Sequence, residues 1–444
     1  MNAVRLTPPT APVRATIPLA SSKSESNRAL IINALTGFRG RLHNVSAARD
    51  SQTMIRLLQS EDAVADVLDA GTTMRFLTAY FAVTGQQKTM TGTPRMCERP
   101  IGILVDALRE LGADIAYLKN DGFPPLQTNG FTSNGTSRLA IRGDVSSQYI
   151  SALLMIAPTL ANGLTLELTG EIGSRPYIEM TLRQMEHFGV KSVADWTNKT
   201  ITVPATPYIP TDYSIESDWS GASYWYSMLA LAQDDSAEIE LLGLKENSLQ
   251  GDSAIVDIMR PLGVTSQFTE QGVILTKIPA ESSLAWDFTD CPDLAQTVAV
   301  CCAVKNIPLT LTGIESLKIK ETDRVFALQT ELKKIGAELV EVVEGSGQGA
   351  EGMGQRDLGK GLGAEGRKYV VRTVPSAQSP RPYAQSPLPT APSIATYEDH
   401  RMAMAFAPVV MRQEVIIEEP GVVAKSYPSF WEDVAKVAGV RIVD

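Results

Sequence analysis

Two short segments far apart in the chain crowd positively charged and hydroxyl-bearing side chains into single turns. One is Ser-Ser-Lys-Ser-Glu-Ser-Asn-Arg at 21–28, and the other is Leu-Lys-Ile-Lys-Glu-Thr-Asp-Arg at 317–324. Such clusters are costly to bury unless an opposite charge joins them, so they favour a site that receives an anion. Because the whole chain carries a formal net charge of -10, the cations are concentrated locally, and we expect anionic small molecules as ligands.

Further charged and hydroxyl-bearing motifs stand where we expect helices to start. Such a start presents free backbone N–H groups, and a neighbouring Lys or Arg adds charge, so it suits an anion. Ordinary helix capping explains each motif about as well when it is taken singly, and their recurrence is what favours a shared site. The motifs are Asp-Ala-Gly-Thr-Thr-Met-Arg at 69–75, Cys-Glu-Arg-Pro-Ile-Gly at 97–102, Ser-Ser-Gln at 146–148, Ser-Arg-Pro-Tyr at 174–177, Asp-Cys-Pro-Asp at 290–293, Glu-Asp-His-Arg-Met-Ala-Met at 398–404 and Lys-Ser-Tyr-Pro at 425–428.

The composition is that of a soluble globular protein, with 44% hydrophobic and 20% charged residues. A chain of 444 residues predicts two domains, and a pI near 5.1 argues against a nucleic-acid groove or an anionic membrane surface. Four cysteines without paired spacing and three scattered histidines argue against a disulfide framework and a zinc site. Because no apolar run is long enough to span a membrane and no leader is recognisable, we expect a cytoplasmic protein.

A repeat organises the elements that must position these motifs. Several helix-period segments end in an apolar residue, a glycine and a small residue that opens a β-rich run, which is the pattern of a left-handed helix C-cap. The glycines are at 112, 189, 263, 336 and 439, so the first four are about 75 residues apart. This period predicts repeated α/β units, each too small to bury a core alone. One helix is expected over 323–336, and strands over 164–168 and 239–242.

The last interval is longer, and composition indicates an insertion at about 344–395. Residues 345–366 are rich in Gly, and residues 375–393 are rich in Pro, Ser and Ala. Gly347–Gly352 matches a dinucleotide-binding pattern, and 354–360 matches most of a P-loop. No apolar helix follows the first, and Gly361 stands where the second needs Ser or Thr. We therefore assign neither a nucleotide.

Taken in this order, the motifs resemble the 5-enolpyruvylshikimate-3-phosphate synthases, also called 3-phosphoshikimate 1-carboxyvinyltransferases. The resemblance runs from about residue 20 to 430, and the segments at 320–324 and 399–404 are its most specific parts. It implies an α/β fold of two similar domains built from repeated βαβαββ-type units, an inside-out α/β barrel with a cleft between the domains. One domain would span 20–218, and the other would combine 1–19 with 219–444.

The implied reaction moves the enolpyruvyl group of phosphoenolpyruvate to the 5-hydroxyl of shikimate 3-phosphate and releases phosphate, in the shikimate pathway to chorismate and aromatic amino acids. Both substrates are polyanions, which agrees with cations gathered in an acidic chain. The resemblance implies no metal, no other cofactor, no nucleic-acid or membrane partner, a monomeric protein and inhibition by glyphosate.

The family's functional residues carry over position by position. For catalysis, the resemblance implies Asp293 as the general base, Glu321 as the carboxylate handling protons at the phosphoenolpyruvate methylene, and Lys23 and Lys425 as supporting cations. The implied shikimate 3-phosphate contacts are Lys23, Ser24, Arg28, Ser146, Ser147, Gln148, Ser174, Asp293, Ser316 and Lys320. The implied phosphoenolpyruvate contacts are Lys23, Gly71, Arg99, Gln148, Arg324, Arg401 and Lys425.

Several positions depart from the commonest family pattern. Asp69 stands where Asn is usual, Phe76 where Pro is frequent, and Ser316 where the family has a ligand-contacting Asn. Glu25 adds a negative charge to the first phosphate-binding turn. These departures keep the reaction class and bear on substrate affinity.

Three other interpretations compete with this one. The enolpyruvyl transferase acting on UDP-N-acetylglucosamine shares the fold and chemistry but resembles these motifs poorly. A non-catalytic phosphosugar-binding protein needs the cations but not the proton-transfer pair Asp293 and Glu321, and both are present. A solenoid interaction protein explains the repeat but not the charged motifs.

Overall fold

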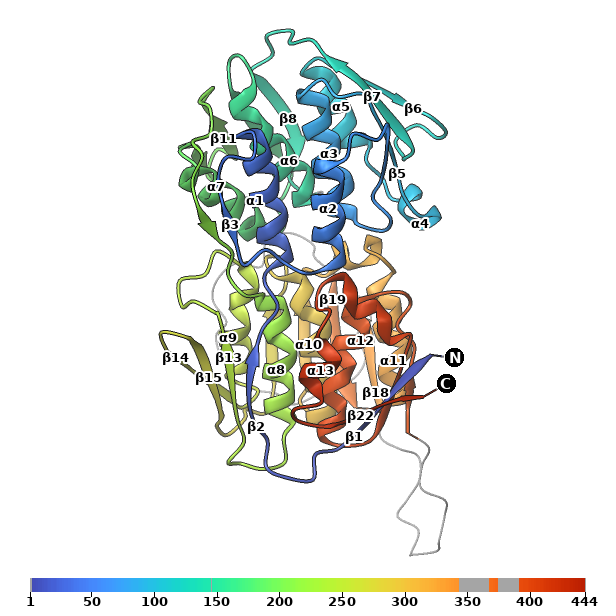
Figure 1. Cartoon of the computed structure of the whole chain (residues 1–444). Coiled ribbons are helices and arrows are strands. Elements are labelled where there is room, and N and C mark those ends of the chain that lie inside the picture. Colours follow the sequence, from blue (N-terminus) through green and yellow to red (C-terminus); the bar gives the residue numbers. More distant parts are fainter. Residues whose placement is uncertain (1, 145, 343–366, 374–390, 444) are drawn as a thin grey trace, which may run out of the picture.

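The computed structural model describes residues 2–144, 146–342, 367–373 and 391–443. Their buried apolar side chains form two separate clusters. One is drawn from residues 29–215, and the other combines residues 4–19 with residues 219–438. We call these parts the first half and the second half; they lie end to end, upper and lower in Figure 1. The clusters follow the expected division of the chain, and the domain boundaries at residues 19/20 and 218/219 stay a prediction.

Five four-stranded sheets share one strand pattern. The strand at one edge pairs in parallel with its neighbour, and the two remaining pairings in each sheet are antiparallel. In the first half they are β4 (Val64–Asp66), β5 (Lys88–Thr91), β7 (Leu126–Phe131) and β6 (Ala113–Tyr117), and β8 (Arg138–Arg142), β9 (Leu164–Thr169), β11 (Thr200–Val203) and β10 (Val193–Asp195). In the second half they are β2 (Arg14–Pro18), β13 (Glu238–Leu242), β15 (Gly272–Lys277) and β14 (Val264–Phe268), then β16 (Leu284–Asp287), β17 (Leu309–Thr312), β19 (Lys368–Thr373) and β18 (Ala337–Val342), and finally β20 (Ser393–Ile394), β21 (Val415–Glu418), β1 (Ala3–Thr7) and β22 (Gly439–Val443). A sixth, parallel pair joins β3 (Leu42–His43) to β12 (Tyr213–Ser214). This repetition confirms the predicted βαβαββ-type units.

Buried helices fill the interior of each half, because parallel strands need a crossover between them. In the first half, α1 (Lys23–Leu35), α3 (Gly71–Val83) and α6 (Ser147–Ile156) pack on one another; in the second, α10 (Ala295–Lys305) packs on α8 (Trp219–Leu231) and α12 (His400–Phe406). All 13 residues of α8 are buried, as expected for a helix apolar on every face. The other helices are α2 (Arg49–Gln59), α4 (Pro94–Cys97), α5 (Gly102–Glu110), α7 (Arg175–His187), α9 (Ile255–Met259), α11 (Arg324–Lys334) and α13 (Phe430–Val434), with the 3₁₀ helices η1 (Ala157–Thr159), η2 (Gly251–Ala254), η3 (Pro292–Leu294), η4 (Glu315–Ile319), η5 (Ala407–Met411) and η6 (Pro420–Lys425).

The chain crosses between the halves twice, and the two crossings lie against each other. Strand β2 of the second half leads into α1, and β12 of the first half leads into α8. Backbone bonds join the crossings: Ser22 N donates to Glu216 O at 2.9 Å, and Asp218 N donates to Ala20 O at 2.8 Å. This pairing makes a two-stranded connection at the waist of the molecule in Figure 1.

Four of the five predicted capping glycines have the expected left-handed backbone, with φ of 112° at Gly112, 87° at Gly189, 94° at Gly263 and 80° at Gly336. The prediction for Gly439 is wrong. Gly439 is the first residue of β22 and pairs with Thr7 of β1. A Cβ at this position would collide with the Thr7 hydroxyl, so the glycine allows a close strand approach. The predicted helix over 323–336 and the two predicted strands are confirmed as α11, β9 and β13.

We expected the range 344–395 to be a single insertion, and this prediction is wrong in part, because some of these residues belong to the sheets of the fold. The range contains β19, which lies between β17 and β18 in its sheet, and the short strand β20. The alternation of Tyr369 and Val371, both buried, with more exposed neighbours is a strand signal that composition concealed. The nucleotide-like matches at 347–352 and 354–360 lie outside the described residues.

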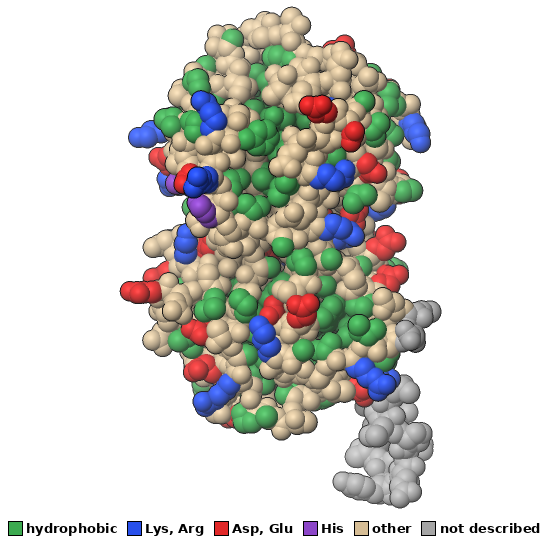
Figure 2. All heavy atoms as spheres, in the orientation of Figure 1, with side chains coloured by type: hydrophobic (Ala, Val, Ile, Leu, Met, Phe, Trp, Pro, Cys, Tyr) green, Lys and Arg blue, Asp and Glu red, His purple; other side chains and the backbone are tan. Residues whose placement is uncertain are grey.

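Both signs of charge are interspersed over the face drawn in Figure 2. Across the described ranges, no helix combines the length and the apolar character needed to cross a membrane.

Candidate active site

A cleft of about 920 Å³ lies between the two halves, and residues of both line it. Its wall includes every predicted site residue except Lys425. From the first half come Lys23, Ser24, Arg28, Gly71, Arg99, Ser146, Ser147, Gln148 and Ser174; from the second come Asp293, Ser316, Lys320, Glu321, Arg324 and Arg401. The structure therefore brings together residues almost 380 positions apart in the chain.

Helix starts form much of the first-half wall. The cleft is lined by the first residues of α1, α3 and α6 and by the residue before α7. The Ser22 hydroxyl caps α1 by accepting from Glu25 N at 3.4 Å, and the Ser146 hydroxyl caps α6 by accepting from Gln148 N at 3.4 Å. Aligned peptide dipoles and free N–H groups make such helix starts favourable for negative charge.

Arg28 is a buried cation whose hydrogen-bond partners are all neutral. Its Nε donates to Thr181 Oγ1 at 2.7 Å, its Nη2 to Ser151 Oγ at 3.1 Å and its Nη1 to Ser24 O at 2.9 Å. Burial lowers its pKa to about 10, because no carboxylate of the described residues forms an ion pair with it. A buried charge of this kind is strongly stabilised by an anionic ligand.

Two further arginines of the first half, Arg75 and Arg99, surround Gly71. The position of a Cβ on Gly71 would lie 2.6 Å from Nη1 of both Arg75 and Arg99, so only glycine leaves these guanidinium groups in place. Arg75 is held by Gly71 O at 2.8 Å and by Pro100 O at 3.3 Å. Burial, and then the charge of Arg99, lower the Arg75 pKa. The two like charges side by side again favour an anion here.

The second-half wall is organised around the buried Arg324. Its Nε donates to Asp399 Oδ2 at 2.6 Å, its Nη1 to Asp293 Oδ1 at 3.0 Å and its Nη2 to Glu321 Oε2 at 3.0 Å. Three carboxylates thus surround one guanidinium, each accepting a charge-assisted bond. Asp399 is fully buried and also caps α12 by accepting from Arg401 N at 2.8 Å, so it fixes Arg324 to that helix.

Asp293 lies between two arginines and beside a tyrosine. Arg401 Nη2 donates to its Oδ2 at 2.7 Å, and the Tyr177 hydroxyl lies 3.4 Å from the same oxygen. Burial alone raises the pKa of Asp293, but Arg401, Lys320 and Arg324 outweigh it and hold the pKa well below the usual value. Asp293 is therefore ionised at neutral pH.

Glu321 and His400 lie on the same wall. Burial raises the pKa of Glu321, but Arg324 and Arg99 outweigh it, so its pKa falls well below the usual value. His400 is buried, and neither ring nitrogen has a hydrogen-bond partner among the described residues. Burial, together with the charge of Lys23, lowers its pKa well below the usual value, so the imidazole is neutral. Asp293 and Glu321 are thus ionised carboxylates on this wall, and His400 is a neutral imidazole beside them.

The two lysines assigned to catalysis are both held by aspartates. Lys23 lines the cleft, and its Nζ lies 3.0 Å from Asp50 Oδ2. Lys425 ends η6, and its Nζ lies 2.5 Å from Asp69 Oδ2. Lys425 is not among the cleft-lining residues, although its two partners, Asp69 and Glu398, are each two positions from a residue that lines the cleft.

Among the cleft-lining residues that sequence reasoning left out of the site, four contact or neighbour the predicted residues in the geometry above: Asp50, Arg75, Tyr177 and His400. Three of them stand inside motifs that we quoted, so a signal was present for Arg75, Tyr177 and His400. Asp50 follows no motif, and only its contact with Lys23 reveals it.

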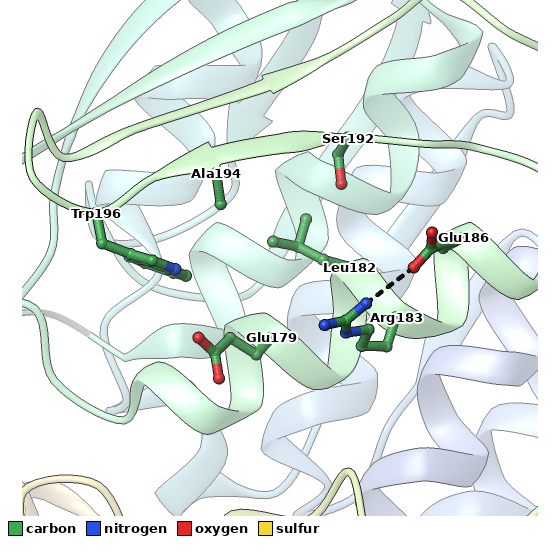
Figure 3. Close-up of a pocket in the computed structure, with 7 residues that line it drawn as sticks. All are labelled: Glu179, Leu182, Arg183, Glu186, Ser192, Ala194 and Trp196. Atoms are coloured by element: carbon green, nitrogen blue, oxygen red, sulfur yellow. Dashed lines mark hydrogen bonds and ion pairs between the residues drawn. The ribbon is translucent and has the colours of Figure 1, made fainter.

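A smaller hollow of about 310 Å³ lies beside α7 in the first half (Figure 3). Its charges are matched locally: Arg183 pairs with Glu186 at 3.1 Å, and Glu179 pairs with Arg175 at 2.8 Å. None of the predicted site residues line this hollow, which Glu179, Leu182, Arg183, Glu186, Ser192, Ala194 and Trp196 surround. We therefore place the active site in the cleft between the halves.

Comparison with known proteins agrees with this geometry. The profile of the family described as EPSP synthase (3-phosphoshikimate 1-carboxyvinyltransferase) matches residues 57–353 and 381–434. The chain belongs to the EPSP synthase family. A 3-phosphoshikimate 1-carboxyvinyltransferase of Bacteroides fragilis is 48% identical over 97% of both chains, and one of Vibrio atlanticus is 32% identical over 93% of this chain and 94% of its own.

A solved EPSP synthase from Acinetobacter baumannii superposes with a TM-score of 0.73 at 17% identity, covering all of both chains. It confirms the predicted enolpyruvyl transferase fold. Membership of the EPSP synthase family also disfavours the UDP-N-acetylglucosamine transferase and the non-catalytic interpretations.

Proposed function

We propose that this member of the EPSP synthase family transfers the enolpyruvyl group of phosphoenolpyruvate to the 5-hydroxyl of shikimate 3-phosphate, and that the assigned cleft residues carry the reaction. The observation that carries this proposal is the pairing of Asp293 and Glu321 on one guanidinium, Arg324. A site for binding alone needs the cations of this cleft but gains nothing from two ionised carboxylates on its wall.

Shikimate 3-phosphate would bind against the first half. Arg28, with its neutral partners, supplies a buried positive charge, and the starts of α1 and α6 supply N–H groups and hydroxyls. We assign its contacts to Lys23, Ser24, Arg28, Ser146, Ser147, Gln148 and Ser174, with Asp293, Ser316 and Lys320 from the opposite wall.

Phosphoenolpyruvate would bind between the halves, where arginines from both converge. The Arg75–Arg99 pair around Gly71 faces Arg324 and Arg401 across the cleft, and Arg forks suit carboxylate and phosphate. Lys23, Gln148 and Lys425 complete the assigned set. Gln148 Nε2 donates to Thr72 Oγ1 at 3.0 Å, which orients the amide beside the start of α3.

The reaction forms one bond and breaks another. The 5-hydroxyl oxygen attacks C2 of phosphoenolpyruvate, and its proton passes to Asp293. C3 takes a proton from the ammonium group of Lys23, which gives a tetrahedral intermediate. A proton then leaves C3, the C2–O bond to phosphate breaks, and phosphate departs. We assign the protons at C3 to Glu321, whose ionised carboxylate would accept the proton that leaves C3, and the surrounding arginines would stabilise the developing negative charge.

Substrate binding would also prepare Asp293 to act as a base. In the free cleft, Arg401 and Arg324 hold its pKa low, which makes it a weak proton acceptor. The anions of phosphoenolpyruvate would compete with Asp293 for those guanidinium groups. As the arginines turn to the substrate, the pKa of Asp293 rises toward the range in which it accepts the hydroxyl proton.

Two further expectations belong to this proposal. The division into residues 20–218 and residues 1–19 with 219–444 gives two bodies joined by the paired crossings, which suits a cleft that closes on its substrates. We also propose that the protein works as a monomer in the cytoplasm.

The test is phosphate release from shikimate 3-phosphate and phosphoenolpyruvate, with each substrate omitted in turn. We expect release only when both are present. Release that requires UDP-N-acetylglucosamine in place of shikimate 3-phosphate, or no release despite shikimate 3-phosphate binding, would overturn the proposal.

A further inference from the structure

The one predicted site residue outside the cleft wall is held by a carboxylate of the opposite half. Lys425 ends η6 in the second half, whereas Asp69 lies in the turn before α3 in the first half. Their Nζ and Oδ2 atoms are 2.5 Å apart, and Lys425 Nζ also donates to Glu398 O at 2.9 Å. With two partners of its own, the ammonium group of Lys425 is already satisfied without any substrate.

A second cation fixes Asp69 in place. Arg49, the first residue of α2, directs Nη2 at both Asp69 oxygens, at 3.0 and 2.9 Å. Partial burial raises the pKa of Asp69, but the hydrogen bond and charge of Lys425, followed by the charge of Arg49, outweigh it, so the pKa is lowered. Asp69 is thus a fixed negative charge that two cations share.

Asp69 is also close in sequence to the anion-binding part of the cleft. It precedes Gly71 by two residues, and the guanidinium groups of Arg75 and Arg99 surround that glycine. An asparagine at this position would have nearly the same shape and no charge. The carboxylate of Asp69 therefore lowers the net positive charge of the phosphoenolpyruvate site by one, and it binds Lys425, which is assigned to that site.

We propose that Asp69 is a specificity-determining residue that weakens the binding of phosphoenolpyruvate and of released phosphate by holding Lys425 in an ion pair between the two halves. The inference rests on the proposed function. When the anion binds, Lys425 leaves Asp69 or shares its charge with it, and either change costs part of the ion pair. The same cost speeds the departure of phosphate after the reaction, since Asp69 recaptures the lysine.

The sign of the effect follows from charge alone. Asp69→Asn keeps the shape of the side chain, frees Lys425 and removes a negative charge near the bound anion. For one partly screened ion pair, we expect the KM for phosphoenolpyruvate and the inhibition constant of inorganic phosphate each to fall about three- to tenfold. The affinity for shikimate 3-phosphate, which is assigned to other residues, should not change.

A matched control comes from the end of β4, just before this turn. Asp66→Asn removes an identical charge three residues away, where the carboxylate only accepts from Leu68 N at 2.8 Å and forms no ion pair among the described residues. We expect its KM for phosphoenolpyruvate to equal that of the unchanged protein. If Asp66→Asn lowers KM as much as Asp69→Asn does, the effect is general electrostatics and the proposal is wrong.

A second variant changes Arg49, the other cation that contacts Asp69. Arg49→Gln leaves the carboxylate to Lys425 alone, so the KM for phosphoenolpyruvate should rise. In the double variant Asp69→Asn/Arg49→Gln, that rise should vanish, because no carboxylate remains for Arg49 to share. If Asp69→Asn fails to fold, Arg49→Gln alone still tests the proposal, because an unchanged or lowered KM for phosphoenolpyruvate in that variant would contradict it.

Two outcomes would overturn the inference while leaving the proposed function intact. One is an Asp69→Asn enzyme that turns over both substrates with unchanged or raised KM for phosphoenolpyruvate and unchanged phosphate inhibition. The other is a large loss of kcat, which would mean that Asp69 positions Lys425 for the reaction. Failure of the proposed function has a different signature, since the unchanged protein would then release no phosphate from the two substrates.

Discussion

The arginines Arg28 and Arg75 of the first half and Arg324 and Arg401 of the second half have opposite kinds of hydrogen-bond partner. In the first half, Arg28 and Arg75 donate to hydroxyls and backbone carbonyls, so their charge is available to a ligand. In the second half, Arg324 and Arg401 are already bound to carboxylates. The contrast indicates that the two walls have different roles. The arginines of the first half would hold an anion tightly, whereas those of the second half would exchange carboxylate partners for substrate during the reaction.

The buried carboxylates differ in the same way. Glu25 lies in α1 of the first half and forms no ion pair among the described residues, and burial raises its pKa to about 7. In contrast, cations hold the pKa of Asp293 and Glu321 below the usual values. A carboxylate with a low pKa stays ionised and can accept a proton when its cations move, whereas Glu25 is protonated only below a pH of about 7 and contacts residues outside the cleft lining.

The largest effect should come from removing the charge of Asp293. Asp293→Asn keeps the shape of the side chain but cannot accept the hydroxyl proton, so we expect kcat to fall about a hundred- to ten-thousandfold. Steady-state phosphate release measures this loss, with circular dichroism to check that the variant is folded. Full activity in a folded Asp293→Asn enzyme would show that Asp293 is not the general base. It would then contradict the proposed difference between the two halves.

A smaller effect should follow from crowding the arginines of the first half. The methyl group in Gly71→Ala would push on Arg75 and Arg99, whose Nη1 atoms lie 2.6 Å from its position. Overpacking of this kind should raise the KM for phosphoenolpyruvate and weaken glyphosate inhibition about five- to a hundredfold. Shikimate 3-phosphate binding is the internal control, and unchanged glyphosate inhibition would show that Gly71 is not at the inhibitor site.

The smallest effect concerns stability and involves Glu25. Its carboxylate accepts from the Tyr213 hydroxyl and from Glu216 N at 3.2 Å, with Lys245 as the cation whose charge it senses. A carboxyl whose pKa is raised on folding adds stability below its unfolded pKa and loses it as pH rises through the folded pKa. Between pH 4.5 and about 7, the loss amounts to at most about 3 kcal/mol.

The measurement for Glu25 is urea unfolding at about pH 5 and about pH 8. Relative to Glu25→Gln, the unchanged protein should lose stability as the pH rises, because only it carries a carboxyl that must ionise. An equal stability difference at the two pH values would show that Glu25 is not protonated in the folded protein.

Much of the fold could be predicted from the chain because its signals are local. A left-handed glycine after a helix marks each of four units at residues 112, 189, 263 and 336, and apolar periodicity gives α11, β9 and β13. Gly439 and β19 escaped the same reasoning. Gly439 is a glycine because β22 and β1 approach closely there, and it does not end a helix. Strand β19 lies between a Gly-rich and a Pro-, Ser- and Ala-rich segment, whose composition predicted an insertion.

The cleft membership of the site residues was also predictable, since the motifs stand at helix starts that open on one surface. Ion-pair partners were not predictable in the same way. The contacts of Lys425 with Asp69 and of Lys23 with Asp50 join residues that no short-range pattern connects. Such pairs depend on how the halves pack, which only the folded chain reveals.

The central claim is that the first half holds shikimate 3-phosphate while carboxylates of the second half move protons. Calorimetric titration of the Asp293→Asn variant with shikimate 3-phosphate, beside its rate of phosphate release, tests this most directly. We predict a dissociation constant within about threefold of the unchanged protein, as expected for the retained shape and hydrogen bonding of the amide, together with the loss of turnover. Loss of shikimate 3-phosphate binding in parallel with turnover would contradict the division between the halves.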